Sequence, residues 1–127
     1  MLRTYLTAAI IFIVLIFGSI WYNKYLSETT TSLDEKLLVI GQEIQLKNWE
    51  NTNILLKKFE DEWNEEKKIC NLLLDHSQID NIDITLERLK SYVTSQDEVL
   101  SLGEVATLRL YFNRIRDIEK ISIENLL

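Results

Sequence analysis

A long apolar run near the amino terminus is the strongest pattern in the chain. Residues 4–22 contain no charged side chain, and between residues 6 and 20 the only polar groups are Thr7 and Ser19. A helix over residues 4–22 is about 28 Å long at 1.5 Å per residue, close to the roughly 30 Å hydrocarbon core of a bilayer. The run therefore predicts a transmembrane helix rather than the buried core helix of a soluble domain.

Aromatic residues flank this run on both sides, where amphipathic rings favour the headgroup level of a membrane. Tyr5 lies at one end, and Trp21 and Tyr25 lie at the other. A cleaved signal peptide is the alternative, but the run is long for one and lacks an A-x-A cleavage pattern. We assign residues 1–25 to a membrane anchor formed by Leu6, Ile10, Ile11, Phe12, Ile13, Val14, Leu15, Ile16, Phe17, Trp21 and Tyr22.

The polar stretch SETTTS at residues 27–32 separates the apolar run from the remaining chain. Three consecutive β-branched threonines lower helix propensity modestly. We expect residues 26–32 to form a short polar stalk, or a loosened helical turn, before an acidic helical domain at residues 33–127.

Residues 33–127 place apolar side chains at steps of three and four, which is the spacing of amphipathic helices. The four predicted apolar stripes are Leu33, Leu37, Ile40 and Ile44; Trp49, Thr52, Leu56, Phe59, Trp63, Cys70 and Leu73; Ile79, Ile82, Leu86, Leu89 and Val93; and Val99, Leu102, Val105, Ala106, Leu108, Phe112 and Ile115. Asn48 is the expected cap of the second helix, which runs to about residue 74, and Ser95 or Asp97 caps the fourth. No stretch alternates apolar and polar residues for long enough to predict a β-strand. The expected fold class is all-α, an N-terminal transmembrane helix followed by an antiparallel four-helix bundle-like ectodomain.

Charge is distributed unevenly around the apolar run. All 20 acidic residues follow it, whereas the amino terminus and Arg3 precede it. This favours a single-pass protein of the cell membrane with a cytoplasmic amino terminus and an extracytoplasmic domain. The acidic domain argues against nucleic acid as a partner. A single cysteine excludes a disulfide framework within the chain, and the absence of proline favours long helices.

The segment DHSQIDNID at residues 75–83 combines three carboxylates with the only histidine of the chain. It lacks the glycine of a calcium loop, and a zinc site normally uses more than one histidine or cysteine. We therefore expect no metal, no cofactor and no catalytic residue. A structural role explains more: Ser77 caps the third helix in a loose capping box, and His76 lies just beyond the second. The candidate partner contacts are Asp75, His76, Asp80 and Asp83.

The acidic run of the second predicted helix has a simple structural explanation. It comprises Glu60, Asp61, Glu62, Glu65 and Glu66, with lysines three or four residues away on the same helix. We expect a solvated helix face there. Trp49 and Trp63 lie on the apolar stripe and are expected in the core, with an exposed aromatic contact for a partner as the alternative. Cys70 is expected to be a small buried side chain.

Several stretches, taken in order, resemble a family of short membrane-anchored proteins from spore-forming Gram-positive bacteria, known as a domain of unknown function. They are NWE at residues 48–50, EDEW at residues 60–63, DHSQIDNID followed by LERLKSY, and the closing EKISIENLL. The chain departs from the family pattern in having Asn48 in place of an acidic residue, and in lacking a tryptophan within residues 71–74. The resemblance implies an exported helical domain with a link to sporulation or envelope biology.

These features predict a non-catalytic accessory or scaffold protein that contacts another membrane or envelope protein. The alternative is an extracytoplasmic module that senses a ligand between its helices and works through a signalling partner. A pocket with convergent polar groups favours the sensor, whereas an exposed apolar surface favours the scaffold. The expected partners are the bilayer and an unidentified membrane or envelope protein, and a homodimer is a further alternative.

Overall fold

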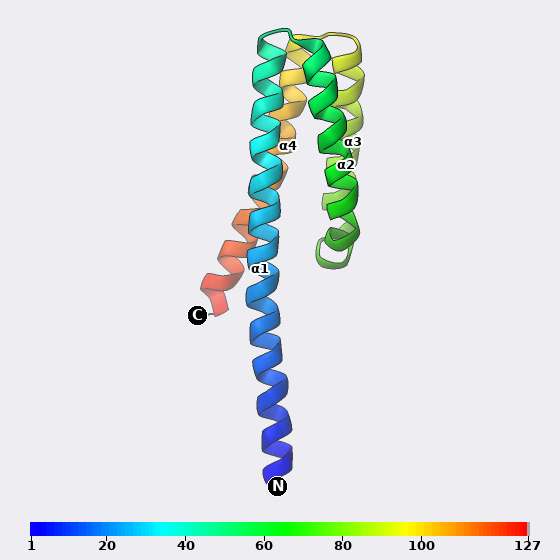
Figure 1. The fold of residues 1–127 in the computed structure, drawn as a ribbon. Helices are drawn as coiled ribbons and strands as arrows, with labels where there is room; N and C mark the ends of the chain where they lie inside the picture. The colour runs from blue at the N-terminus through cyan, green and yellow to red at the C-terminus, as the bar shows by residue number, and fades with distance from the viewer. Residues whose placement is uncertain (127) are drawn as a thin grey trace.

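The structure is a computed structural model that describes the backbone of residues 1–126 and the side chains of residues 1–117. Within these residues the chain forms four helices and no strand, so the all-α prediction is confirmed. The helices are α1 (Leu2–Gln45), α2 (Trp49–Leu73), α3 (His76–Thr94) and α4 (Glu98–Leu126). The first part of α1 extends alone, and its second part packs against α2 and α4, while α3 packs against α2 and α4 on the opposite side (Figure 1).

The apolar run and the helical domain share one continuous helix. The expected stalk at residues 26–32 differs in the structure, because these residues are helical and belong to α1. Leu26 and Thr30 are buried, and they continue the apolar stripe of Leu33 by steps of four and three. The hydroxyl of Thr30 donates to the carbonyl of Leu26, which satisfies the buried polar group. Burial of this stripe thus outweighs the modest helix propensity of the threonines.

The core lies between the four helices where their apolar stripes face one another. The ring of Trp63 meets that of Phe112 edge-on at 5.7 Å, and Phe59 meets the same ring at 6.3 Å. Trp63 is 1% exposed and Cys70 is 3% exposed, so their predicted core positions are confirmed. Trp49 is partly buried and packs against the core cluster.

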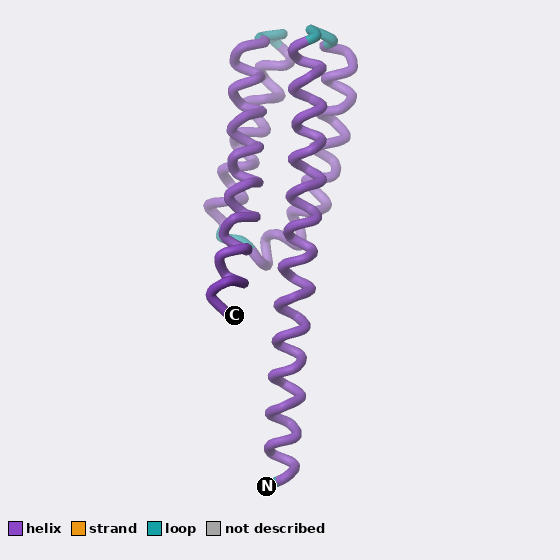
Figure 2. The backbone as a smooth tube through the Cα atoms, turned by 90° about the vertical axis from the view of Figure 1, so that its left-hand side faces the viewer, coloured by secondary structure: helices purple, strands orange, loops and turns teal. Residues whose placement is uncertain are grey.

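The turns of the domain lie at two ends, which we name by their distance from the amino terminus. The far end carries the α1–α2 turn at residues 46–48 and the α3–α4 turn at residues 95–97 (Figures 1 and 2). The near end carries the α2–α3 turn at residues 74–75, which lies beside the middle of α1. The carboxyl end of α4 also points toward the near end (Figure 1).

Both far-end turns use the same backbone geometry. Lys47 and Gln96 each have a φ of 55°, the left-handed conformation that closes a helix. The next residue then caps the following helix through its side chain. Asn48 accepts from the amide of Asn51, and Asp97 accepts from the amide of Leu100 at 2.9 Å. The predicted caps at Asn48 and Asp97 are therefore confirmed.

A cluster of charges joins α4 to α1. The guanidinium of Arg109 donates to Asp34 at 2.9 Å, and Arg116 lies 3.5 Å from the other oxygen of the same carboxylate. The side chain of Asp34 is 13% exposed, so both partners help to compensate its loss of hydration. This cluster holds two turns of α4 against α1.

Candidate membrane-facing and partner-facing surfaces

The apolar run of α1 is exposed around its whole circumference. Every residue from 1 to 18 is exposed, and large side chains such as Phe12 and Leu15 are each 65% accessible. The helix is long and apolar enough to cross a membrane, and none of its most apolar window is buried inside the protein. No other part of the described protein covers this apolar surface. A helix that is apolar on every side and exposed is typical of a helix that contacts lipid.

Aromatic residues connect this run to the domain. Trp21 is exposed and stacks on Tyr25 with ring centroids 5.7 Å apart. The hydroxyl of Tyr25 donates to the carboxylate of Glu66 on α2. One turn earlier, the hydroxyl of Tyr22 donates to the carbonyl of Leu73 at 3.2 Å, at the end of α2. The domain therefore begins where the apolar run ends, without an intervening linker.

An open groove lies between α1 and α2. Its volume is about 520 Å³, and its walls are mainly apolar, with Val39 and Leu55 on opposite sides and the buried Phe59 beneath them. The ammonium of Lys36 pairs with the carboxylate of Glu62 across the groove, joining the two helices. The residues that line the groove are Ser32, Glu35, Lys36, Val39, Ile40, Leu55, Lys58, Phe59 and Glu62. An open groove with mainly apolar walls suits the apolar face of a partner helix.

The DHSQIDNID segment forms the end of the α2–α3 turn and the start of α3, but with a different cap from the one predicted. The cap of α3 is Asp75, whose carboxylate accepts from the backbone amide and from the hydroxyl of Ser77. The predicted cap at Ser77 is therefore wrong, whereas His76 lies just beyond α2 as expected and is also the first residue of α3. An extended backbone at Asp75 places its short carboxylate against the free amides of the helix. Asp75, His76 and Asp80 are all exposed at the near end.

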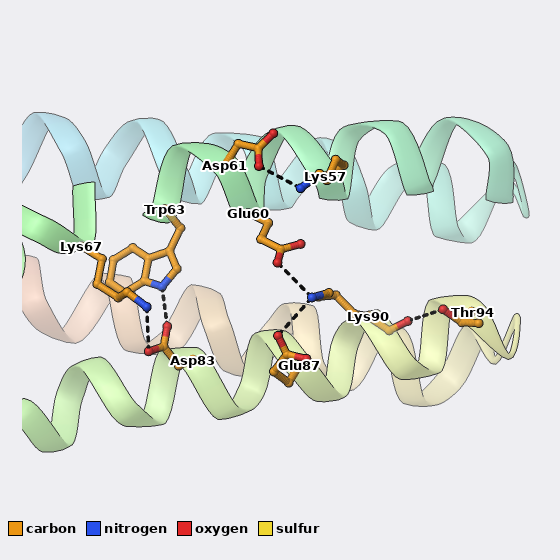
Figure 3. Close-up of polar contacts among 9 residues, drawn as sticks. All are labelled: Lys57, Glu60, Asp61, Trp63, Lys67, Asp83, Glu87, Lys90 and Thr94. Carbon is orange, nitrogen blue, oxygen red and sulfur yellow. Dashed lines mark hydrogen bonds and ion pairs between the residues drawn. The ribbon is translucent and has the colours of Figure 1, made fainter. Parts of the chain in front are cut away.

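Asp83, the fourth predicted contact, is engaged within the protein. The indole nitrogen of Trp63 donates to one carboxylate oxygen at 2.8 Å, and Lys67 donates to the other at 3.2 Å (Figure 3). Both donors come from α2, so Asp83 joins α3 to the core tryptophan. Its role is thus more than the favourable placement of a negative charge near a helix N-terminus.

The acidic run of α2 is only partly a solvated face. Asp61 pairs with Lys57 on the exposed side of the same helix, as the spacing predicts (Figure 3). Glu60 instead accepts from Lys90 on α3 at 2.9 Å, and these contacts together with Glu87 raise the pKa of the Lys90 ammonium. Glu62 and Glu66 contact α1, as described above. Helical periodicity indicates which side chains lie on one face, but it does not identify the helix that faces them.

The groups with metal-binding or nucleophilic chemistry lie apart. Within the described side chains, no three of histidine, cysteine, aspartate and glutamate gather at one point. Cys70 is buried, and burial followed by the charge of Glu66 raises the pKa of its thiol to about 11. A thiol held in this form is a weak nucleophile at neutral pH.

The comparisons with known proteins identify one family. The family model described as a domain of unknown function, DUF4363, matches residues 20–126, which includes the whole helical domain and the last residues of the apolar run. Neither the curated proteins nor the solved structures give a match to the chain.

Proposed function

The chain belongs to the DUF4363 family, whose domain has no known function. From the surfaces of the chain itself, we propose that it is a membrane-anchored accessory protein without catalytic activity. In this proposal residues 4–22 cross the cell membrane, and an antiparallel four-helix bundle stands on the extracytoplasmic side. The groove between α1 and α2 then receives an apolar segment of another membrane or envelope protein. The resemblance to proteins of spore-forming Gram-positive bacteria makes sporulating cells the first place to look for this partner.

The anchoring part rests on one observation, the apolar circumference of α1 over residues that contact no other helix. Side chains on opposite faces of this helix, such as Ile11 and Ile13, are both more than half exposed. In water this surface would be strongly unfavourable, at roughly 25 cal/mol per Å² of apolar area. A bilayer removes the cost. The positive charge of Arg3 before the run supports a cytoplasmic amino terminus.

Topology can be tested with a membrane-impermeant thiol reagent on intact cells. In a Cys70→Ala background, a cysteine added after Leu127 should be labelled without lysis, because the proposal places the domain outside. The matched control is Leu2→Cys, at an exposed position before the apolar run, which should react only after lysis. The reverse pattern would contradict the orientation. Release of the full-length protein by alkaline carbonate would contradict the anchor itself.

The partner-binding part rests on the shape and composition of the groove. The groove is open to solvent, and its apolar wall includes Val39, which is 44% exposed. Of the charged side chains that line the groove, Lys36 and Glu62 pair with each other, and most of the exposed lining is apolar. This arrangement supports a protein segment as the occupant, because a small polar ligand is usually fixed by polar groups that point inward.

Site-specific photocrosslinking in native membranes tests the groove. A photoreactive amino acid at Val39 should give a discrete adduct, whereas the same probe at Ile84 of α3, which is 55% exposed, should not. Equal adducts at the two positions would show that the groove is not special. An adduct with twice the mass of the chain would identify a homodimer in place of a different envelope protein.

A ligand sensor is the second candidate function, and the groove volume favours it. About 520 Å³ lies within the roughly 300–1,000 Å³ of small-molecule sites. In that case the chain purified in mild detergent should carry a bound small molecule, visible by native mass spectrometry and lost in Val39→Glu. The accessory role instead predicts the mass of the chain alone in both variants.

A further inference from the structure

The last helical turn of α2, which leads into the α2–α3 turn, presents a leucine that the fold itself does not use. Leu72 is 84% exposed, more than any other described large apolar side chain except Met1. Its neighbour Leu74 packs against the core, and Asp75 caps the next helix, so both have structural roles. Leu72 is in the last turn of α2, where a polar residue would serve the helix as well.

The level of this turn along α1 is fixed by Tyr22. The tyrosine hydroxyl donates to the carbonyl of Leu73, which ties the turn to the last residue of the uncharged stretch 4–22. Side chains of a helix lean toward its N-terminus, which for α1 is the direction of the apolar run. The carbonyl of Leu73 therefore lies level with Tyr22 or closer to the run. Figure 1 shows the same placement, with the turn beside the middle of α1.

We propose that the α2–α3 turn is a second membrane contact, in which Leu72 inserts at the boundary between headgroups and acyl chains. The proposal rests on the anchoring role of α1: a span at residues 4–22 ends at the level where the turn lies. The occupant is the bilayer that α1 itself crosses.

The charges around the turn favour insertion by apolar contact over binding to anionic lipid. Asp75 and Asp80 are exposed near it and carry negative charge, and Lys24 and Lys68 are the exposed cations closest in sequence to Tyr22 and Leu72. Such a mixed set offers no cluster of positive charge for an anionic headgroup. A zwitterionic bilayer surface, which has no net charge, is therefore sufficient for this contact. Attachment at two points would fix the tilt of the domain, and with it the direction in which the α1–α2 groove opens.

Quenching by lipid-borne nitroxides tests this contact in the full-length chain. The protein is reconstituted into phosphatidylcholine vesicles in a Cys70→Ala background, with nitrobenzoxadiazole attached to a single cysteine. Three exposed positions are compared: Leu72→Cys at the near end, Phe12→Cys in the apolar run, and Leu46→Cys at the far end, which is 73% exposed in the parent. Two quenchers are used in turn: a phosphatidylcholine with its nitroxide near the start of the acyl chain, which reports on Leu72, and one with its nitroxide near the end of the chain, which reports on Phe12 at the middle of the span.

The proposal expects loss of fluorescence and a blue-shifted emission at Leu72 and Phe12, with neither change at Leu46. Quenching at Phe12 with none at Leu72 would overturn the second contact and leave the anchor standing. Absence of quenching at both positions would contradict the anchor as well. A blue shift at Leu72 without quenching would overturn the proposal in favour of contact with a second copy of the chain.

Discussion

The two ends of the helical domain are held together by different means. At the far end, the α1–α2 and α3–α4 turns have the same three-residue geometry, with a left-handed residue followed by a side-chain cap. At the near end a single turn joins α2 to α3, and side chains from distant parts of the sequence supply the remaining contacts. Tyr22 and Tyr25 of α1 reach across to α2 there. The far end is thus specified locally, whereas the near end depends on tertiary contacts.

This difference affects how the apolar run of α1 is coupled to the domain. Leu26 lies one turn after Tyr22 and is fully buried, so α1 enters the core directly after the apolar run. A rigid helix carries orientation from one end to the other, whereas a flexible stalk does not. The near end is therefore where the position of the domain relative to the apolar run is set.

Truncation at the near end should give the largest change in the free energy of unfolding, and it tests most directly what the near end contributes. A fragment that begins at Asn23 retains Tyr25 and Leu26, whereas one that begins at Ser32 loses both of them and Thr30. Loss of one buried leucine costs about 2–5 kcal/mol, and the shorter fragment should lose more than that. Urea unfolding followed by circular dichroism measures the difference. Equal midpoints would mean that the near end contributes nothing to stability.

Substitution of Trp63 tests the connection between the core and α3. Trp63→Ala should lower the free energy of unfolding by about 3–5 kcal/mol, because the ring is fully buried against Phe112. Trp63→Phe keeps most of the ring but removes the donor to Asp83, and should cost about 1 kcal/mol. Calorimetry in mild detergent measures both. Equal losses in the two variants would assign the whole effect to the hydrogen bond.

Alkaline pH should weaken the near half of the domain. Burial raises the pKa of the Cys70 thiol to about 11 in the folded chain, from an ordinary value of 9.0. The folded state therefore favours the protonated thiol, and this contribution is complete below pH 9. It is lost as the pH rises through 11, because the unfolded state gives up its proton first. Urea midpoints between pH 8 and pH 11 should fall less steeply in Cys70→Ala, and parallel curves would exclude this contribution.

The α2–α3 turn provides a test of the corrected cap. Asp75→Ala should cost about 1 kcal/mol, since its carboxylate accepts the amide of Ser77 at the start of α3. Ser77→Ala should cost less, because its hydroxyl only donates to Asp75. The melting temperatures of Asp75→Ala and Ser77→Ala, measured side by side, decide which residue caps α3. A larger loss in Ser77→Ala would restore the cap expected from the sequence.

The same contrast explains which features could be predicted from the sequence. The helices, the Asn48 cap and the burial of Trp63 depend on spacing within a few residues, and local patterns carry that information. The position of Asp83 against Trp63, and of Glu66 against Tyr25, depends on how far one helix is displaced along another. Turn geometry and core packing together set that displacement, and the apolar pattern of one helix does not reveal it.

The sequence leaves open a stalk or a loosened helical turn at residues 26–32, and the structure has an unbroken helix there for a related physical reason. Three threonines at residues 29–31 argue locally for a break, but Thr30 faces the core and bonds to the carbonyl of Leu26. Its burial could be recognised only by extending the stripe of Leu33 backward across the polar stretch. The groove between α1 and α2 could not be predicted either, because Val39 and Leu55 lie on different helices.

The smallest expected effect concerns the far end, where two ordinary residues adopt a conformation that favours glycine. Lys47 and Gln96 have φ values of 55°, and a side chain there costs about 1–2 kcal/mol relative to glycine. Part of this gain is offset, because glycine makes the unfolded chain more flexible by about 0.5–1 kcal/mol. Lys47→Gly and Gln96→Gly should therefore each stabilise the domain by up to about 1 kcal/mol, measured as a higher urea midpoint. Glycine at Leu46, which has a helical φ of −79°, is the control and should destabilise. If glycine at Lys47 or Gln96 lowered the midpoint as much as it does at Leu46, the far-end turns would not be specified by their left-handed residues, and the contrast between the two ends would fail.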